Sequence, residues 1–304
     1  LEEHNLKGKL ELSKFENPEI NLAFDSKIKL DAALKFFPVD TIKELAGEMA
    51  LSAELEGSLK DIKKNPFSNK VKLNFNSRVN KFEIKFKHDE NNFSVESCSL
   101  SSNDGGIKVD GLKLIRNHSD INIDGKIPNL FEYLNENKSP IIIDGKLFSE
   151  NFYLEDFLLV KSDPTKKGND FLIPSNIELD LKSEVKNFYF DKFIANNIFG
   201  RVEIKNRKAL AENASFQTMD GSAEVNLFAD NSSGNLEVTV QSQCKAININ
   251  KLFFQLNNFG QNTMTNQNLK GIASSTIDFT GIWDKDLNVK ENSIKANCNL
   301  KIEQ

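Results

Sequence analysis

Apolar and polar residues alternate along much of the chain, a pattern typical of β-strands with one face in water. Val71, Leu73 and Phe75, for example, alternate with Lys72 and Asn74. Successive side chains of a strand point to opposite faces, so each run gathers its apolar side chains on one face. The pattern returns at Phe82/Ile84/Phe86, Ile121/Ile123, Ile177/Leu179/Leu181, Val202/Ile204, Val225/Leu227 and Leu236/Val238/Val240. Strands that are wet on one face favour an antiparallel sheet.

Turn residues separate the predicted strands at short spacing. Asp-Gly pairs stand at 104–105, 110–111, 124–125, 144–145 and 220–221, and residues 231–234 form a further candidate. Asp, Asn and Gly tolerate the positive φ angles that tight hairpins require. We therefore predict a hairpin turn at each of these places.

Three short apolar stretches predict helices, at about residues 31–46, 129–135 and 251–259. Pro38 forces a break in the first of them. Each stretch is too short to be stable alone, so we expect each helix to lie against the sheet.

The three predicted helices share a sequence context. Each follows a strand that ends on Asp31, Asp124 or Asn250, and in the first copy Gly47 and Gly57 then bracket another strand. The resulting weak internal repeats lie around residues 28–61, 121–160 and 247–286. Repetition of a strand-helix-strand unit predicts that residues 1–304 form a single elongated section whose sheet grows by adding copies.

The predicted fold is mostly β: an elongated, curled antiparallel sheet with a few short helices. A wide sheet with one apolar face needs a cover, which helices this short are too small to provide. A second sheet could supply the cover and complete a sandwich. Alternatively, the sheet could curl into a trough whose apolar inside is open to an apolar ligand. The sequence leaves both arrangements open.

Composition and charge narrow the classes of function. The net charge is −5, from 39 basic and 44 acidic residues that are interleaved. Nucleic-acid binding requires a basic stripe, and none is visible, so we expect no nucleic-acid partner. Cys98, Cys244 and Cys298 are far apart, and we expect isolated, buried thiols.

Targeting signals are not visible in the sequence. No apolar run approaches the roughly 18 residues of a membrane-spanning helix, and the chain opens on Leu1 without a signal peptide. The last strand-like stretch runs to the end of the chain without a closing turn. We therefore expect a section of a longer protein.

The sequence contains no recognisable catalytic motif. His4, His88 and His118 lie far apart, and there is no nucleophile elbow, P-loop or dinucleotide-binding glycine fingerprint. We expect neither an enzyme nor a cofactor.

One stretch of the sequence nearly matches a calcium-binding loop. Asp120, Asn122, Asp124 and Gly125 match the first part of an EF-hand loop, but Phe131 stands where the bidentate Glu belongs. The intervening isoleucines alternate as they would in a strand. We therefore predict a strand that ends in an Asp-Gly turn, and no metal site.

Three motifs characterise the stretch from Cys244 to Glu303. They are Asn258-Phe259-Gly260-Gln261, Asn268-Leu269-Lys270-Gly271 and Phe279-Thr280-Gly281-Ile282-Trp283-Asp284. With them, this stretch resembles the C-terminal region of AsmA-family proteins, particularly the long AsmA-like proteins of Bacteroidetes-type bacteria. Residues 17–61 and 200–221 are similar to the internal segments and the recurring hairpin of the same AsmA-like and TamB-like proteins.

The resemblance implies a repeating β-groove with a continuous apolar inner surface. It also implies a periplasmic location, in a parent protein that an N-terminal helix anchors in the inner membrane. The family is linked to phospholipid movement toward the outer membrane and to envelope integrity. The implied partners are therefore phospholipid or another acyl lipid, and other envelope proteins.

The leading hypothesis is a lipid-binding or lipid-transfer groove, in which acyl chains lie along the apolar face and head groups stay in water. The candidate lipid-facing residues are Val202, Ile204, Val225, Leu227, Leu236, Val238 and Val240. For each of them, ordinary sheet core is the competing interpretation. The competing function is a structural or assembly scaffold of the envelope, which predicts a closed core and no ligand.

Overall fold

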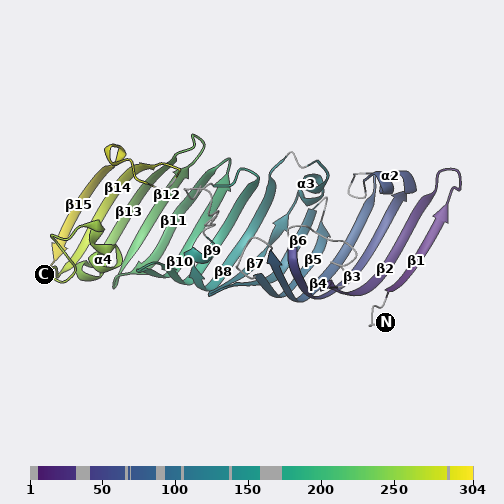
Figure 1. Cartoon of the computed structure of the whole chain (residues 1–304), viewed down its shortest axis with the longest axis horizontal. Helices are drawn as coiled ribbons and strands as arrows, with labels where there is room; N and C mark the ends of the chain where they lie inside the picture. The colour runs from purple at the N-terminus through teal and green to yellow at the C-terminus, as the bar shows by residue number, and fades with distance from the viewer. Residues whose placement is uncertain are drawn as a thin grey trace. The chain divides into compact units, whose positions relative to one another are not determined.

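The computed structural model describes residues 6–31, 42–65, 68, 70–86, 93–103, 106–136, 139–157, 173–285 and 288–303. In this part of the chain the strands form one open 15-stranded sheet whose strand order follows the sequence (Figure 1). The prediction of a mostly β, curled antiparallel sheet with short helices is confirmed. Contacts divide the chain into two compact units, Leu1–Gly145 and Lys146–Gln304.

The first unit contains a run of antiparallel strands and two described helices. The strands are β1 (Leu6–Ser13), β2 (Glu19–Lys29), β3 (Ile42–Ser58), β4 (Lys72–Phe86), β5 (Phe93–Asn103), β6 (Gly106–Arg116) and β7 (Ser119–Ile127). The helices are α2 (Leu59–Lys64) and α3 (Leu130–Glu136). The unit boundary falls within β8 (Ile141–Tyr153).

The second unit continues with the same construction. Its strands are β9 (Ile177–Phe190), β10 (Phe193–Lys205), β11 (Lys208–Thr218), β12 (Gly221–Asp230), β13 (Leu236–Asn248), β14 (Ile272–Trp283) and β15 (Lys295–Glu303). Its helical segments are η1 (Leu154–Asp156), α4 (Ile249–Gln255), η2 (Asn257–Gly260) and η3 (Glu291–Ser293).

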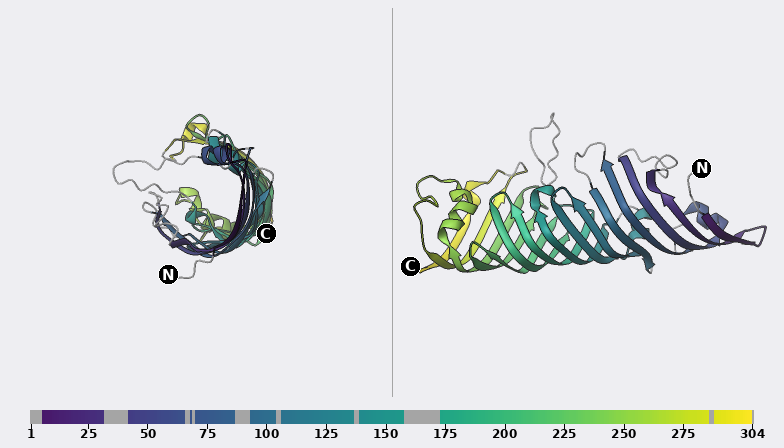
Figure 2. Two further views of the ribbon diagram at one scale, coloured as in Figure 1. Left: turned by 90° about the vertical axis from the view of Figure 1, so that its right-hand side faces the viewer. Right: turned by 90° about the horizontal axis from the view of Figure 1, so that it is seen from below.

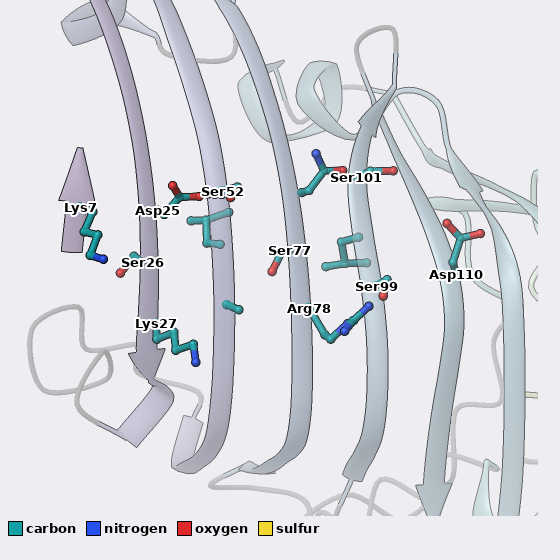
Figure 3. Close-up of a pocket in the computed structure, with 14 residues that line it drawn as sticks. Lys7, Asp25, Ser26, Lys27, Ser52, Ser77, Arg78, Ser99, Ser101 and Asp110 are labelled. Carbon is teal, nitrogen blue, oxygen red and sulfur yellow. Dashed lines mark hydrogen bonds between the residues drawn. The ribbon is translucent and has the colours of Figure 1, made fainter. Parts of the chain in front are cut away.

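Bulges interrupt the strand pairing in both units. The register shifts beside Gly111 in the first unit, and beside Asn213 and Ala246 in the second. All three residues have positive φ angles, between 50° and 60°. Because a bulge bends its strand and increases the local twist, these positions favour the bowed strands visible in Figures 2 and 3.

The predicted turns have mixed outcomes. Residues 220–221 and 231–234 do connect β11 to β12 and β12 to β13, whereas Asp104 and Gly105 lie outside the described residues. The other three predictions are wrong, because these Asp-Gly pairs lie inside β6, β7 and β8. Gly111 occupies a bulge, and Gly125 and Gly145 allow two backbones to approach, since a Cβ on either would meet a carbonyl oxygen at 2.4 Å.

The predicted helices also need correction. The helix at 129–135 is confirmed as α3, and the helix at 251–259 is confirmed as α4 up to Gln255, because Asn258 and Phe259 in η2 have left-handed backbone angles. Most of the helix expected at 31–46 lies outside the described residues, but its last part is wrong, because residues 42–46 belong to β3. These residues pair with β4, so their backbone hydrogen bonds are made within the sheet. The repeats around 28–61, 121–160 and 247–286 stay a prediction.

The core of the first unit lies on the apolar face of its sheet. Val95, Cys98 and Val109 are buried there with Ile107, and Phe131 of α3 packs against them. Burial raises the pKa of the Cys98 thiol. All three cysteines are without a disulfide, but the expectation of buried thiols holds only for Cys98: Cys244 is half-buried and Cys298, on the edge strand β15, is exposed.

Candidate functional site

The seven candidate residues lie on one face of the second unit. Strand pairing joins Val202 through Ala211 to Leu227, and Leu227 to Val240. The row extends at its two ends to Leu181 and Phe279. Residues directly opposite each other in a sheet share a face, so one apolar row crosses β9 to β14.

A second row runs beside the first. Ile204 pairs with Leu179 and Ala209, and on the neighbouring strands Ala229 pairs with Val238. The two remaining candidates extend the same face, because Val225 pairs with Ala214 and Leu236 pairs with Trp283. We refer to this surface, defined by the seven candidates and their cross-strand partners, as the apolar face.

The apolar face is only partly shielded from water. All seven candidate side chains are half-buried, and none falls in the fully buried class. The strands described in this unit all belong to the one sheet, so no second sheet formed by them covers these side chains. The described residues therefore form an open sheet rather than the closed sandwich that the sequence also allowed.

The opposite face of the same strands is charged. The guanidinium of Arg201 donates two hydrogen bonds of 2.7 Å to the carboxylate of Asp180, and it also lies near Glu212. The hydrogen bond from Arg201 lowers the pKa of Asp180. Lys205 pairs with Glu178 at 2.9 Å. Charged side chains thus pair across the strands on this polar face, and the seven candidate side chains lie on the other.

Helix α4 crosses one end of the second unit's strands. Its first turn is tied to the β11–β12 turn through Lys251 and Asp220, and its last residue, Gln255, accepts a hydrogen bond from the backbone of Ile194 in β10. Figures 1 and 2 show α4 on the concave side of these strands.

Three buried alanines lie near the strand ends to which α4 is tied through Ile194, Asp220 and Gly271. Ala195, Ala223 and Ala273 are each at most 5% exposed, although their short side chains rise little above the sheet. The longer side chains of Val225 and Leu227, farther along the strands, stay half-exposed. The helix therefore covers one end of the apolar face and leaves the middle open.

Sequence reasoning missed an aromatic series on the sheet. Phe152, Phe188, Phe193 and Phe216 follow one another across β8 to β11, with ring centroids 5.9, 6.2 and 6.3 Å apart. The alternation within single strands cannot reveal such a series, because it depends on the register between strands. The abundance of Phe, 24 residues in the chain, was the only signal available.

A depression of about 660 Å³ lies on the first unit (Figure 3). Strand pairing places its charged side chains on the polar face, where Lys7 lies opposite Asp25 and Asp25 opposite Ser52. Cations and carboxylates both line it: Lys7, Lys27, Arg78, Asp25 and Asp110. Because both signs of charge are present, the depression selects no single class of ligand.

The described part of the chain contains neither a cluster of metal-binding side chains nor a membrane-spanning helix. No group of three or more His, Cys, Asp or Glu side chains there is arranged to hold a metal ion. The near-match to a calcium loop falls in β7, so the predicted strand is confirmed. No helix among the described residues has the length and hydropathy needed to cross a membrane.

Comparisons with known proteins give no relative. No protein-family model, no curated protein and no solved structure matches the chain.

Proposed function

We propose that the apolar face binds lipid acyl chains, and that the protein is a lipid-transfer groove of AsmA type. In this role it shields acyl chains while phospholipid moves between the inner and outer membranes. The observation that supports the proposal most is that all seven candidate side chains stay partly exposed on one open sheet, and none is fully buried. Soluble proteins rarely leave an apolar surface of this kind open unless it binds something.

The apolar row is long enough for an acyl chain. It crosses β9 to β14, and because neighbouring strands lie about 4.8 Å apart, its length is about 24 Å. The chains of one bilayer leaflet fill roughly 15 Å, half of the hydrocarbon core. Burial of each methylene group contributes about 0.8 kcal/mol, so contact along part of the row is enough to retain a lipid.

The first test is the lipid that the protein carries from the cell. The whole chain is purified without detergent, and extracted lipid is quantified by mass spectrometry beside an unrelated β-sandwich. We expect phospholipid near or above one molecule per chain. Replacing Leu227→Gln and Val240→Gln should lower it on the order of tenfold, because both changes remove apolar contacts.

The control places the same residue type on the opposite face. The control variant carries Asn226→Gln and Thr239→Gln. These two residues lie next to the test positions on β12 and β13, but on the polar face. This variant should leave the retained lipid unchanged. Lipid no higher than in the β-sandwich, or an equal loss in both variants, would favour the scaffold function instead.

A further inference from the structure

The segment that contains α4 and η2 displays apolar side chains to solvent. Phe254 is 51% exposed, Phe259 56% and Met264 56%, and Leu256 is also exposed. Large apolar residues at this exposure are common singly, but four within eleven residues form a patch. We call these four side chains the apolar tip.

The segment that bears the apolar tip is firmly attached to the sheet. The Asn248 side chain caps α4 by accepting a hydrogen bond from the backbone N–H of Lys251, and it also donates to Asp220 at 3.0 Å. Beyond the helix, the ammonium of Lys192 donates to Asn257 at 3.0 Å. Contacts of Asn248 and Asn257 therefore fix α4 and the start of η2 to the neighbouring turns of the sheet.

The backbone turn at Phe259 is left-handed, and the ring of Phe259 packs edge-on against that of Phe253, with centroids 5.1 Å apart. Asn257, Asn258, Phe259 and Gly260 all have left-handed φ angles, between 50° and 70°. A bulky residue such as Phe rarely adopts this conformation. Hydrogen bonds to side chains close the turn; in one of them the backbone N–H of Asn266 donates to the side-chain oxygen of Asn258 at 2.9 Å. The chain thus holds an unfavourable turn that exposes an aromatic ring.

The charged side chains of the segment are lysines, of which Lys251 is paired with Asp220. Residues 249–271 include two lysines, Lys251 and Lys270, and no Asp or Glu. The ammonium of Lys192, from the β9–β10 hairpin, lies 5.6 Å from the centre of the Phe254 ring. Aromatic and aliphatic side chains flanked by lysines are typical of segments that lie in the interface of an anionic bilayer.

We propose that the apolar tip docks on the surface of a bilayer that contains anionic lipid. Phe254, Phe259 and Met264 enter the boundary between head groups and acyl chains, while Lys192 and Lys270 face the anionic head groups. The tip is separate from the residues of the apolar rows. Membrane docking by the tip and lipid binding by the apolar face can therefore be tested separately, and loss of one does not require loss of the other.

The test is flotation of the whole chain with vesicles. One set contains phosphatidylcholine alone, and the other contains phosphatidylcholine with phosphatidylglycerol. We expect the wild-type protein to float with the second set and much less with the first. The double variant Phe254→Ser/Phe259→Ser should bind at least about tenfold more weakly, because it removes two apolar anchors.

The matched control is Phe199→Ser. Phe199 is 49% exposed, so it loses a similar apolar surface, but it lies in β10 opposite Ser215 and Glu184. Flotation should be unchanged in this variant. Absence of flotation in the wild-type protein would overturn the proposal, as would equal binding to the two vesicle sets. Self-association that the double variant abolishes, without vesicle binding, would show a protein interface instead.

A second measurement covers the case in which the double variant does not fold. Phe259→Trp is introduced into a Trp283→Phe background, so that the new side chain is the only tryptophan. Its emission should shift to the blue on mixed vesicles and be quenched by brominated acyl chains. Emission that neither shifts nor is quenched would overturn the proposal.

Discussion

At the residue scale, Trp283 reports on the apolar face directly. It is the single tryptophan of the chain, and it pairs with Leu236 at the end of β14. Its ring lies over Gly281 and 6.2 Å from the ring of Phe279. The emission of this side chain therefore depends on what covers the face beside it.

Gly281→Ala should displace this ring. The new methyl group would meet the Trp283 ring at 2.9 Å, a contact that is too close to persist. Because the far end of a side chain can move, we expect a modest loss of stability, about 1 kcal/mol. The main effect should be a red shift of the emission as the ring becomes more exposed. Thr280→Ala, on the polar face, is the control; emission identical to wild type in Gly281→Ala would contradict this placement.

At the scale of the element, the strands were predictable and their partners were not. Alternation identified the strands that carry Val202, Leu227 and Val240, and it placed each side chain on the correct face relative to its neighbours in sequence. It could not show that Val202 and Leu227 meet through Ala211, because register is set between strands.

Sequence signals for turns were ambiguous where the same residues are favoured in a hairpin turn and in a β-bulge. The pair Asp110-Gly111 fits a hairpin and a bulge equally well, since both need positive φ. By contrast, α2 was missed although its signal was present. Ser58 is a preferred N-cap residue, and its hydroxyl accepts a hydrogen bond from the backbone N–H of Asp61 and donates to the Asp61 carboxylate.

The anchor of α4 makes this helix sensitive to pH. The pKa of Asp220 is lowered mainly by the hydrogen bond from Lys251. Burial opposes this shift, and a hydrogen bond from Asn248 adds to it. A carboxyl group whose pKa is lower in the folded state stabilises that state above its ordinary pKa of 3.8, and this contribution is lost as the pH falls through the folded value.

Asp220→Asn should therefore loosen α4 at neutral pH. We expect faster amide hydrogen exchange in residues 249–255, and exchange in the strand β12 unchanged. In the wild-type protein the same loosening should appear only below about pH 4. Asp278→Asn, on the polar face of β14, is the control. An α4 that exchanges at the wild-type rate in Asp220→Asn would show that the ion pair does not hold the helix.

At the scale of the whole molecule, each unit repeats one construction. In the first unit α3 packs on the buried cluster around Val95 and Cys98, and in the second α4 covers the end of the face near Ala223 and Ala273. In both, a sheet with one apolar face carries a helix too short to cover it. An uncovered apolar face of this kind is what the proposed lipid binding requires.

The most direct test of lipid binding asks which face of the sheet touches lipid in the cell. A photo-crosslinking amino acid is placed in the whole chain at Ile204 or Val238 on the apolar face, and at the neighbouring Glu203 or Glu237 on the polar face. After irradiation of living cells, mass spectrometry identifies the adducts. We expect phospholipid adducts at Ile204 and Val238 alone. Equal adducts on the two faces, or none at Ile204 and Val238, would contradict a lipid-binding apolar face.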